Sequence, residues 1–197
     1  MKQPYHHGSL RQTLLEASEA ILNRDGIDGL TLRAAAREAG VSHGAPAHHF
    51  GDLTGLLTEL AASGFIRLRE RVEAAIAAEP ENYMVASGRG YLSFARSYPG
   101  IFQLMFRSER LNWSAPSLSE AGPAAFALLS QEGVGREKPD VDAANNLILA
   151  STRWSLMHGL ASLVIDGRLG AMVDKAGDGN LDLLIEKVLL TGLAGMR

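Results

Sequence analysis

Cysteine is absent from the chain of 197 residues, and so are the sequence signatures of common enzymes. Without cysteine there are no disulfides, thiolate metal ligands or cysteine nucleophiles, and a reducing location is permitted, so we expect a cytoplasmic protein. Nucleophile-elbow, phosphate-loop, dinucleotide-binding and zinc-protease patterns do not occur. We therefore predict that the protein is not an enzyme and has no catalytic residues, no cofactor and no metal site.

Long hydrophobic runs and an excess of positive charge are lacking too. The longest apolar-rich stretch, residues 156–165, is too short to cross a bilayer, which takes about 20 residues, so we expect no membrane partner. No apolar run follows a basic segment near the start, which predicts no signal peptide. Because the formal net charge is −3, binding of nucleic acid would need a local basic face rather than a basic protein.

Helical patterns fill the first quarter of the chain. Apolar residues at helical spacing predict a first helix over residues 10–23. Thr31 is a good N-cap for a second helix, and Gly40 ends it because glycine enters the left-handed region without steric cost. Ser42 is predicted to cap a third helix, over residues 42–50. Two short helices joined by a tight glycine turn are typical of a helix-turn-helix, whose second helix enters the DNA major groove.

The same segment carries an ordered set of motifs: an apolar first helix, a Thr-capped helix over residues 31–39, the run Ala39-Gly40-Val41-Ser42 and the pair His49-Phe50. In this it resembles the TetR family of bacterial transcription regulators. Residues 5–11 and 154–160 resemble a branch of that family named for a Trp-His-Gly signature. The resemblance implies a DNA-binding domain over residues 1–56 and a helical ligand-binding and dimerisation domain over residues 57–197.

The rest of the chain also has the pattern of helices, without a convincing strand run, so we predict an all-α fold. A long fourth helix is expected to be capped by Asp52 or Thr54 and to end before Pro80. The segment 167–182 holds four glycines and is predicted to be a loop with at most a short helical turn. Further helices are predicted over residues 81–98, 99–107, 117–131, 141–165 and 181–195.

The predicted third helix carries small and polar residues that suit the reading of DNA. Histidine can donate to or accept from guanine and adenine edges, and small residues allow close approach or contact with a thymine methyl. The alternative is an ordinary surface helix with no ligand. We predict DNA contacts from Thr31, Arg33, Ser42, His43, Gly44, Ala45, His48 and His49.

Two positions depart from the pattern of the family. Members usually carry Tyr where Ala47 stands and Lys where Leu53 stands, and the Tyr hydroxyl often meets a phosphate. The resemblance implies that both changes reduce DNA affinity without abolishing the fold.

Large side chains recur at helical spacing in residues 57–197. Most of them have the pattern of core residues, but the resemblance implies an apolar inducer cavity in the same region. For His158 a role in the core or at an interface is the alternative. We predict a ligand-binding set of Tyr91, Phe94, Phe102, Phe106, Phe126, Trp154, Met157 and His158.

Together these features predict a homodimeric, ligand-responsive transcription regulator. We expect a repressor that binds a palindromic operator in double-stranded DNA and releases it on binding a small apolar inducer. Dimerisation is expected through residues 141–165 and 181–195. The alternative is a dimeric helical ligand-binding or interaction protein with weak or lost operator binding, which Ala47 and Leu53 favour.

Overall fold

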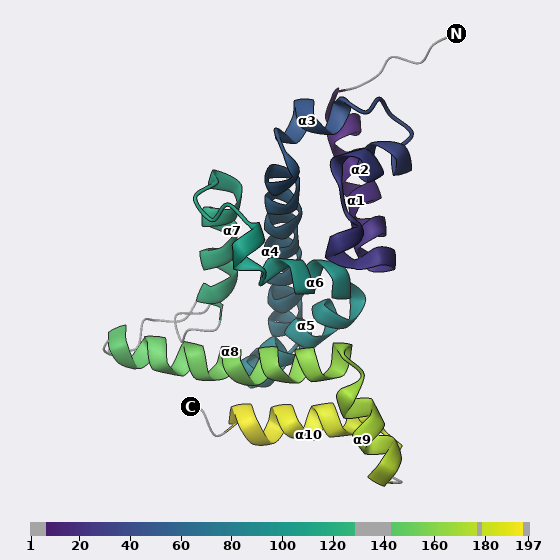
Figure 1. Ribbon diagram of the computed structural model, residues 1–197. Helices are drawn as coiled ribbons and strands as arrows, with labels where there is room; N and C mark the ends of the chain where they lie inside the picture. The colour runs from purple at the N-terminus through teal and green to yellow at the C-terminus, as the bar shows by residue number, and fades with distance from the viewer. Residues whose placement is uncertain (1–6, 129–142, 177–178, 195–197) are drawn as a thin grey trace. The chain divides into compact units, whose positions relative to one another are not determined.

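The computed structural model describes residues 7–128, 143–176 and 179–194, and within these ranges it contains helices and turns and no strand (Figure 1). The predicted all-α class is confirmed. Predicted helix ends at residues 129–131, 141–142 and 195 lie outside the described ranges. The α-helices are α1 (His7–Gly29), α2 (Leu32–Glu38), α3 (Ala45–Phe50), α4 (Leu53–Ala78), α5 (Tyr83–Ser97), α6 (Pro99–Met105), α7 (Pro116–Ala127), α8 (Ala143–Ile165), α9 (Arg168–Ala176) and α10 (Leu181–Ala194), with short 3-10 turns at Pro80–Asn82 and Ser108–Arg110.

The chain forms two compact units. We call Met1–Phe65 with Tyr98–Ala121 the head unit, and Ile66–Ser97 with Gly122–Arg197 the body unit. Helices α4 and α7 each continue from one unit into the other. Each unit is therefore built from two separate segments of the chain. The predicted domain boundary between residues 56 and 57 stays a prediction.

The core of the head unit forms where α1 packs against α2 and α6. Leu14 and Ile21 lie on the inner face of α1 and are almost fully buried, and burying side chains of this size stabilises a fold by roughly 1.5–3 kcal/mol each. Helix α6 approaches α1 closely at Gly100, where a Cβ would lie 3.0 Å from the backbone carbonyl of Leu22. Helix α1 extends to Gly29, beyond the predicted end at residue 23, and is broken at Gly26 (φ 71°).

In the body unit, α5 packs against α8 and α10. Gly88 makes the contact with α10 possible, because a Cβ there would lie 2.8 Å from the side chain of Leu189. Arg89 joins the same helices, since its Nε donates to Glu186 at 2.9 Å. Hydrogen bonding from Arg89 lowers the pKa of Glu186, so the carboxylate stays charged.

The prediction of a loop over residues 167–182 is wrong for its first half, which forms α9. Gly167, with φ 70°, ends α8, and a new helix begins at the next residue. Leu169, Met172 and Val173 follow helical spacing and give α9 an apolar face, with Val173 buried.

Helix α8 is longer than the apolar stretch visible in the sequence. Its segment Ala144–Ile165, with 22 residues and a mean hydropathy of 1.2, is long and apolar enough to cross a membrane by length and composition. The prediction that this region is too short was therefore wrong, because the helix begins well before residue 156. Core helices of soluble proteins have the same composition. Within one chain only 28% of the segment is buried.

Candidate functional site

Helix α2 and the turn after it form as the sequence indicates. The N-cap is Thr31, whose hydroxyl oxygen accepts from the Ala34 N–H at 3.1 Å. Gly40 adopts φ 66°, and the N–H groups of Gly40 and Val41 donate to the carbonyls of Arg37 and Ala36 at 3.2 and 3.0 Å. This pair of bonds is a Schellman motif, which ends a helix sharply. The predicted cap and stop are confirmed.

Helix α3 begins later than predicted, at Ala45, and Ser42 is not its cap. The N-cap is Gly44, which makes no side-chain capping bond, and the carbonyl of Ser42 accepts from the Ala45 N–H at 3.0 Å. Pro46 in the first turn explains the start, because the N–H that proline lacks has no partner within a helix there. The prediction that Ser42 caps this helix is therefore wrong.

The residues of α3 predicted to contact DNA lie on both its buried and its exposed face. Ala45, Pro46 and Phe50 are buried and hold α3 against the head unit. Ala45 is thus a core residue, which argues against its predicted contact with DNA bases. His49 is half-buried, and its ring meets that of His48 edge-on, with centroids 5.5 Å apart. The exposed members of the predicted set are Thr31, Arg33, Ser42, His43, Gly44 and His48.

Ala47 and Leu53, the two departures from the family pattern, flank the end of α3. Ala47 is exposed on α3, and Leu53 is the half-buried first residue of α4. Asp52 caps α4, since its Oδ1 accepts from the Gly55 N–H at 2.8 Å. At position 47, the exposed face of α3 thus presents only the methyl group of Ala47, without the hydroxyl of the usual Tyr.

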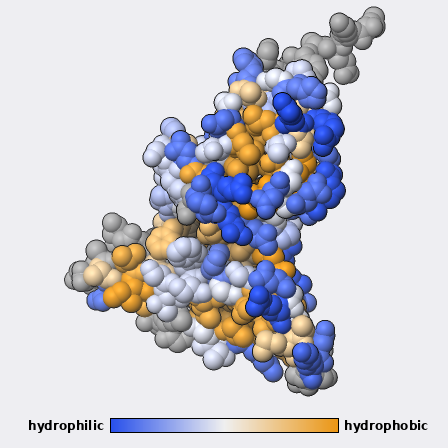
Figure 2. Space-filling view, viewed as in Figure 1, coloured by the Kyte–Doolittle hydropathy of each residue, from blue (hydrophilic) through white to orange (hydrophobic). Residues whose placement is uncertain are grey.

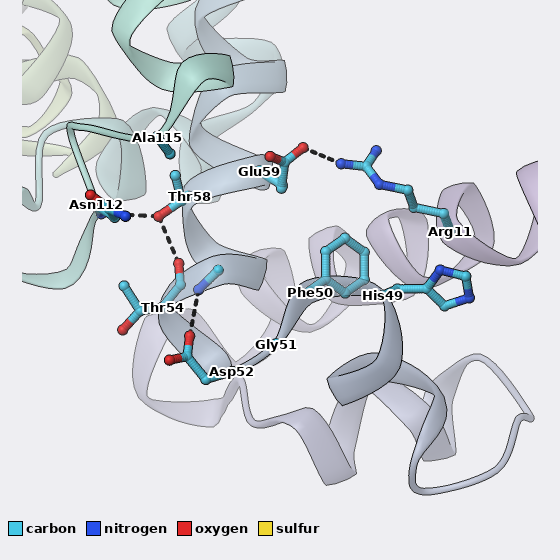
Figure 3. Close-up of a pocket in the computed structure, with 11 residues that line it drawn as sticks. Arg11, His49, Phe50, Gly51, Asp52, Thr54, Thr58, Glu59, Asn112 and Ala115 are labelled. Atoms are coloured by element: carbon cyan, nitrogen blue, oxygen red, sulfur yellow. Dashed lines mark hydrogen bonds and ion pairs between the residues drawn. The ribbon is translucent and has the colours of Figure 1, made fainter.

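A pocket of about 340 Å³ lies beside the α3–α4 turn (Figure 3). Its wall on the α4 side includes Thr58, which is buried and accepts from the backbone N–H of Asn112 at 3.0 Å. Its opposite wall includes Arg11, which pairs with Glu59. The lining residues are Arg11, His49, Phe50, Gly51, Asp52, Thr54, Gly55, Thr58, Glu59, Asn112 and Ala115.

Arg11 and Glu59 are functional candidates that the sequence did not reveal. The Arg11 guanidinium lies over the Phe50 ring, 5.4 Å from its centroid, and also binds the Glu59 carboxylate. Glu59 Oε1 accepts in addition from the Ser117 hydroxyl at 2.8 Å. These partners are separated by 48 and 58 positions in the chain, so no local spacing could have joined them.

In the body unit, part of the predicted ligand set comes together. The Tyr91 hydroxyl lies 3.1 Å from His158 Nδ1, and the ring of Trp154 lies between those of Phe126 and His158, 5.9 Å from each. Phe126, Trp154 and His158 are half-buried, whereas Tyr91 is buried. Phe94 and Met157, at 0% and 1% exposure, are core residues.

Burial shifts the pKa of both titratable groups of this cluster. Burial raises the pKa of Tyr91, and a hydrogen bond with the Trp154 side chain offsets part of that rise. The Tyr91 hydroxyl and His158 Nδ1 share a hydrogen bond, in which the tautomer of the imidazole decides which group donates. Burial lowers the pKa of His158 and so favours the neutral imidazole.

Phe102 and Phe106, the remaining members of the predicted ligand set, belong to the head unit. Phe106 contacts Phe102 and Phe65 edge-on, at centroid distances of 5.2 and 5.8 Å, and Trp113 extends the cluster from Phe65 at 6.0 Å. These rings thus contact aromatic neighbours within the head unit. Their helical spacing in the sequence is explained by this packing.

The α2–turn–α3 unit, with its buried anchors and exposed polar face, defines a helix-turn-helix DNA-binding module. Comparison with known proteins agrees: residues 14–60 match the tetR family of bacterial regulatory proteins, and residues 84–188 match the tetracyclin repressor-like C-terminal domain. The chain belongs to the TetR family of transcription regulators, whose members are transcription factors and not enzymes. Assignment to the Trp-His-Gly branch stays a prediction.

Three relatives show how far the similarity extends. A protein of unknown function from Rhodococcus sp. RHA1 is 35% identical in sequence, with 99% of this chain and 97% of that chain covered and a TM-score of 0.75. A TetR-family transcriptional regulator from Streptomyces coelicolor is 21% identical, with 95% and 99% covered and a TM-score of 0.59. The uncharacterized HTH-type transcriptional regulator YobS of Bacillus subtilis (strain 168) is 21% identical over 158 residues, 80% of each chain.

Proposed function

We propose that this protein is a cytoplasmic, homodimeric repressor that binds a palindromic operator through α3 and releases it when a small apolar inducer binds the body unit. The observation that carries the proposal is the division of α3, in which Phe50 and Pro46 are buried while His48 is exposed. A helix held in this way presents one face to the major groove. Thr31, Arg33 and His43 would contact the DNA beside it.

Binding to the DNA upstream of the protein's own gene tests the operator. We expect wild type to retard this fragment in preference to a scrambled one, and His48→Ala to lose affinity by about ten-fold, the discrimination of a lost base contact. Arg168→Ala is the matched control, because it removes an exposed side chain in the body unit, and it should bind like wild type. Equal binding of both fragments by wild type would contradict the proposal.

The cluster of Tyr91, Trp154 and His158 supports the inducer site. Half-buried rings supply apolar surface for a ligand, beside the hydrogen-bonded Tyr91 and His158. We therefore propose an apolar or aromatic inducer. The chain has two tryptophans, so a Trp113→Phe variant leaves Trp154 as the sole reporter. Quenching of Trp154 by inducers that also release DNA supports the site; release without any change in Trp154 contradicts it.

The exposed apolar side chains of α8 and α10 support the dimer. Leu147 and Ile148 on α8 are 59% and 61% exposed, and Leu183 and Leu190 on α10 are 49% and 45% exposed. Figure 2 shows hydrophobic surface over the first turns of α8 and between α8 and α10. A second copy would cover these faces as a four-helix bundle.

Sedimentation tests the dimer with a matched pair of variants. Leu147→Glu should give a monomer at micromolar concentration, because it places a charge in the proposed interface. Met172→Glu changes an equally exposed side chain, at 65%, on α9, and should stay dimeric. A monomeric wild type would overturn this part of the proposal.

The second candidate function is a dimeric ligand-binding or interaction protein without operator activity. Ala47 favours it, because the exposed position on α3 lacks a hydroxyl for a phosphate. Ala47→Tyr distinguishes the two candidates. A gain of affinity over a measurable wild-type value supports a weakened regulator, whereas binding that appears only in Ala47→Tyr supports loss of operator activity.

A further inference from the structure

We propose that Arg11 is a positioning residue for the recognition helix α3, and that Glu59 and Ser117 hold Arg11 in place. The proposal rests on the proposed DNA-binding function, and it concerns residues outside the face that would meet DNA bases. We call Arg11, Phe50, Glu59 and Ser117 the Arg11 clamp.

The first half of the clamp fixes the C-terminal end of α3. Phe50 is the last residue of α3, and the helix ends at Gly51, which has φ 77°. The Phe50 ring is 9% exposed, and the Arg11 guanidinium lies over it at 5.4 Å. A guanidinium stacked on a ring is attracted to its π-face. Arg11 therefore restrains both the ring and the end of the helix that carries it.

The second half fixes Arg11 itself. Glu59 accepts from Arg11 with Oε2 and from Ser117 Oγ with Oε1, so both carboxylate oxygens are engaged. A carboxylate held at both oxygens has one orientation, and it aligns the guanidinium fork in turn. Next to it, Thr58 accepts from the Asn112 N–H at 3.0 Å, which ties the segment before α7 to α4 a second time.

The clamp is exposed enough that its main effect is on geometry rather than on stability. The side chains of Arg11 and Glu59 are 43% and 28% exposed, and ion pairs with such exposure contribute little to folding. A small tilt at the C-terminal end of α3, however, moves His48 relative to base edges, where hydrogen bonds need their full geometry. The alternative role for Arg11 is a direct phosphate contact. Such a contact depends on the positive charge alone and changes the dependence of DNA affinity on salt concentration.

Operator binding separates these roles. For a positioning residue, Arg11→Gln and Arg11→Lys should both lower operator affinity by about ten-fold, because lysine keeps the charge but loses the planar stack. Affinity for random DNA and the slope of affinity against salt should stay at wild-type values, and Ser117→Ala should lower operator affinity by about three-fold. Arg69→Gln breaks an ion pair of similar exposure on α4, 42% and 39%, and should have no effect.

A phosphate contact gives the opposite pattern. Arg11→Gln would then weaken operator and random DNA equally and lower the salt slope by about one, Arg11→Lys would restore binding, and Ser117→Ala would have no effect. Any of these results overturns the proposal.

Hydrogen exchange in the protein without DNA tests the clamp independently of operator binding. Arg11→Gln and Ser117→Ala should speed exchange of the α3 amides by about three-fold or more, while Arg69→Gln should not. Unchanged exchange overturns the proposal. If wild type binds no operator but α3 exchanges faster in the clamp variants, the proposed DNA function fails while the positioning of α3 by Arg11 stands.

Discussion

The head unit and the body unit differ in how they use their polar and apolar side chains. In the head unit, polar groups such as Asp52, Thr58 and Glu59 are engaged in bonds that fix turns and helix ends. The body unit instead keeps apolar side chains such as Leu147 and Ile148 exposed on long helices. The head unit is thus complete in geometry, whereas the body unit is completed by a second chain and a ligand in the proposed function.

The largest expected effect concerns the tightest approach in each unit. A Cβ at Gly55 in the head would lie 2.0 Å from the backbone oxygen of Phe50, which has no way to move aside. A Cβ at Gly192 in the body would lie 2.4 Å from Leu156 Cδ2, the end of a flexible side chain. We expect Gly55→Ala to lower the free energy of unfolding by about 3 kcal/mol and Gly192→Ala by about 1 kcal/mol. Urea denaturation measures both; equal losses would show that the units do not differ in rigidity.

A smaller effect is expected from the cap of α2. Thr31→Ala removes the acceptor of the Ala34 N–H and should lower the free energy of unfolding by about 1 kcal/mol. Thr31→Ser keeps the oxygen and serves as the control, with stability close to that of wild type. If alanine and serine at this position are equally stable in thermal denaturation, the hydroxyl does not act as a cap.

The body unit should respond to acid through His158. Burial lowers its folded-state pKa, so between that value and the ordinary one the unfolded chain binds a proton that the folded chain does not. The stability is fully present above about pH 6.5, the ordinary histidine value, and is lost as the pH falls through the lowered pKa. His158→Gln should lose less stability than wild type between pH 7.5 and pH 5.5. Urea unfolding followed by Trp154 fluorescence in Trp113→Phe measures the difference; identical losses would contradict it.

The smallest effect is expected at an exposed ion pair of the head unit. Arg24 binds Glu38 at 3.1 Å and thereby lowers the pKa of that carboxyl, but both groups lie at the surface. Arg24→Ala should leave the thermal midpoint within experimental error of wild type, because water and salt screen such pairs. A clear drop would mean that surface pairs contribute to the rigidity of the head.

Local signals in the sequence predicted both ends of α2 correctly, but not the start of α3. Thr31 caps the start of α2 through one hydrogen bond of its hydroxyl oxygen, and Gly40 ends the helix with a positive φ. Both effects act within a few residues, so the sequence alone predicts them. The prediction that Ser42 caps α3 was wrong, because Pro46 favours a helix that begins at Ala45. The preference of serine for the N-cap position does not take a nearby proline into account. The sequence did not predict helix α9, because the glycines of this segment favour a loop. The apolar residues after Gly167 nevertheless follow helical spacing.

Contacts between distant segments could not be predicted from the sequence. Arg11 and Glu59 carry no motif, and only the fold brings them together, with Arg11 over the Phe50 ring. Likewise, Phe102 and Tyr91 look alike in the sequence as aromatic residues on predicted helices. Their separation into the head and body units depends on long-range packing that spacing does not encode.

Footprinting of the DNA upstream of the gene tests the central claim most directly, that the head unit reads DNA as half of a two-fold dimer. The account predicts two protected half-sites of inverted sequence with centres about 34–36 Å apart or a multiple of it, and weaker protection with His48→Ala. Absence of protection, or one asymmetric site covered by a single subunit, would contradict the account.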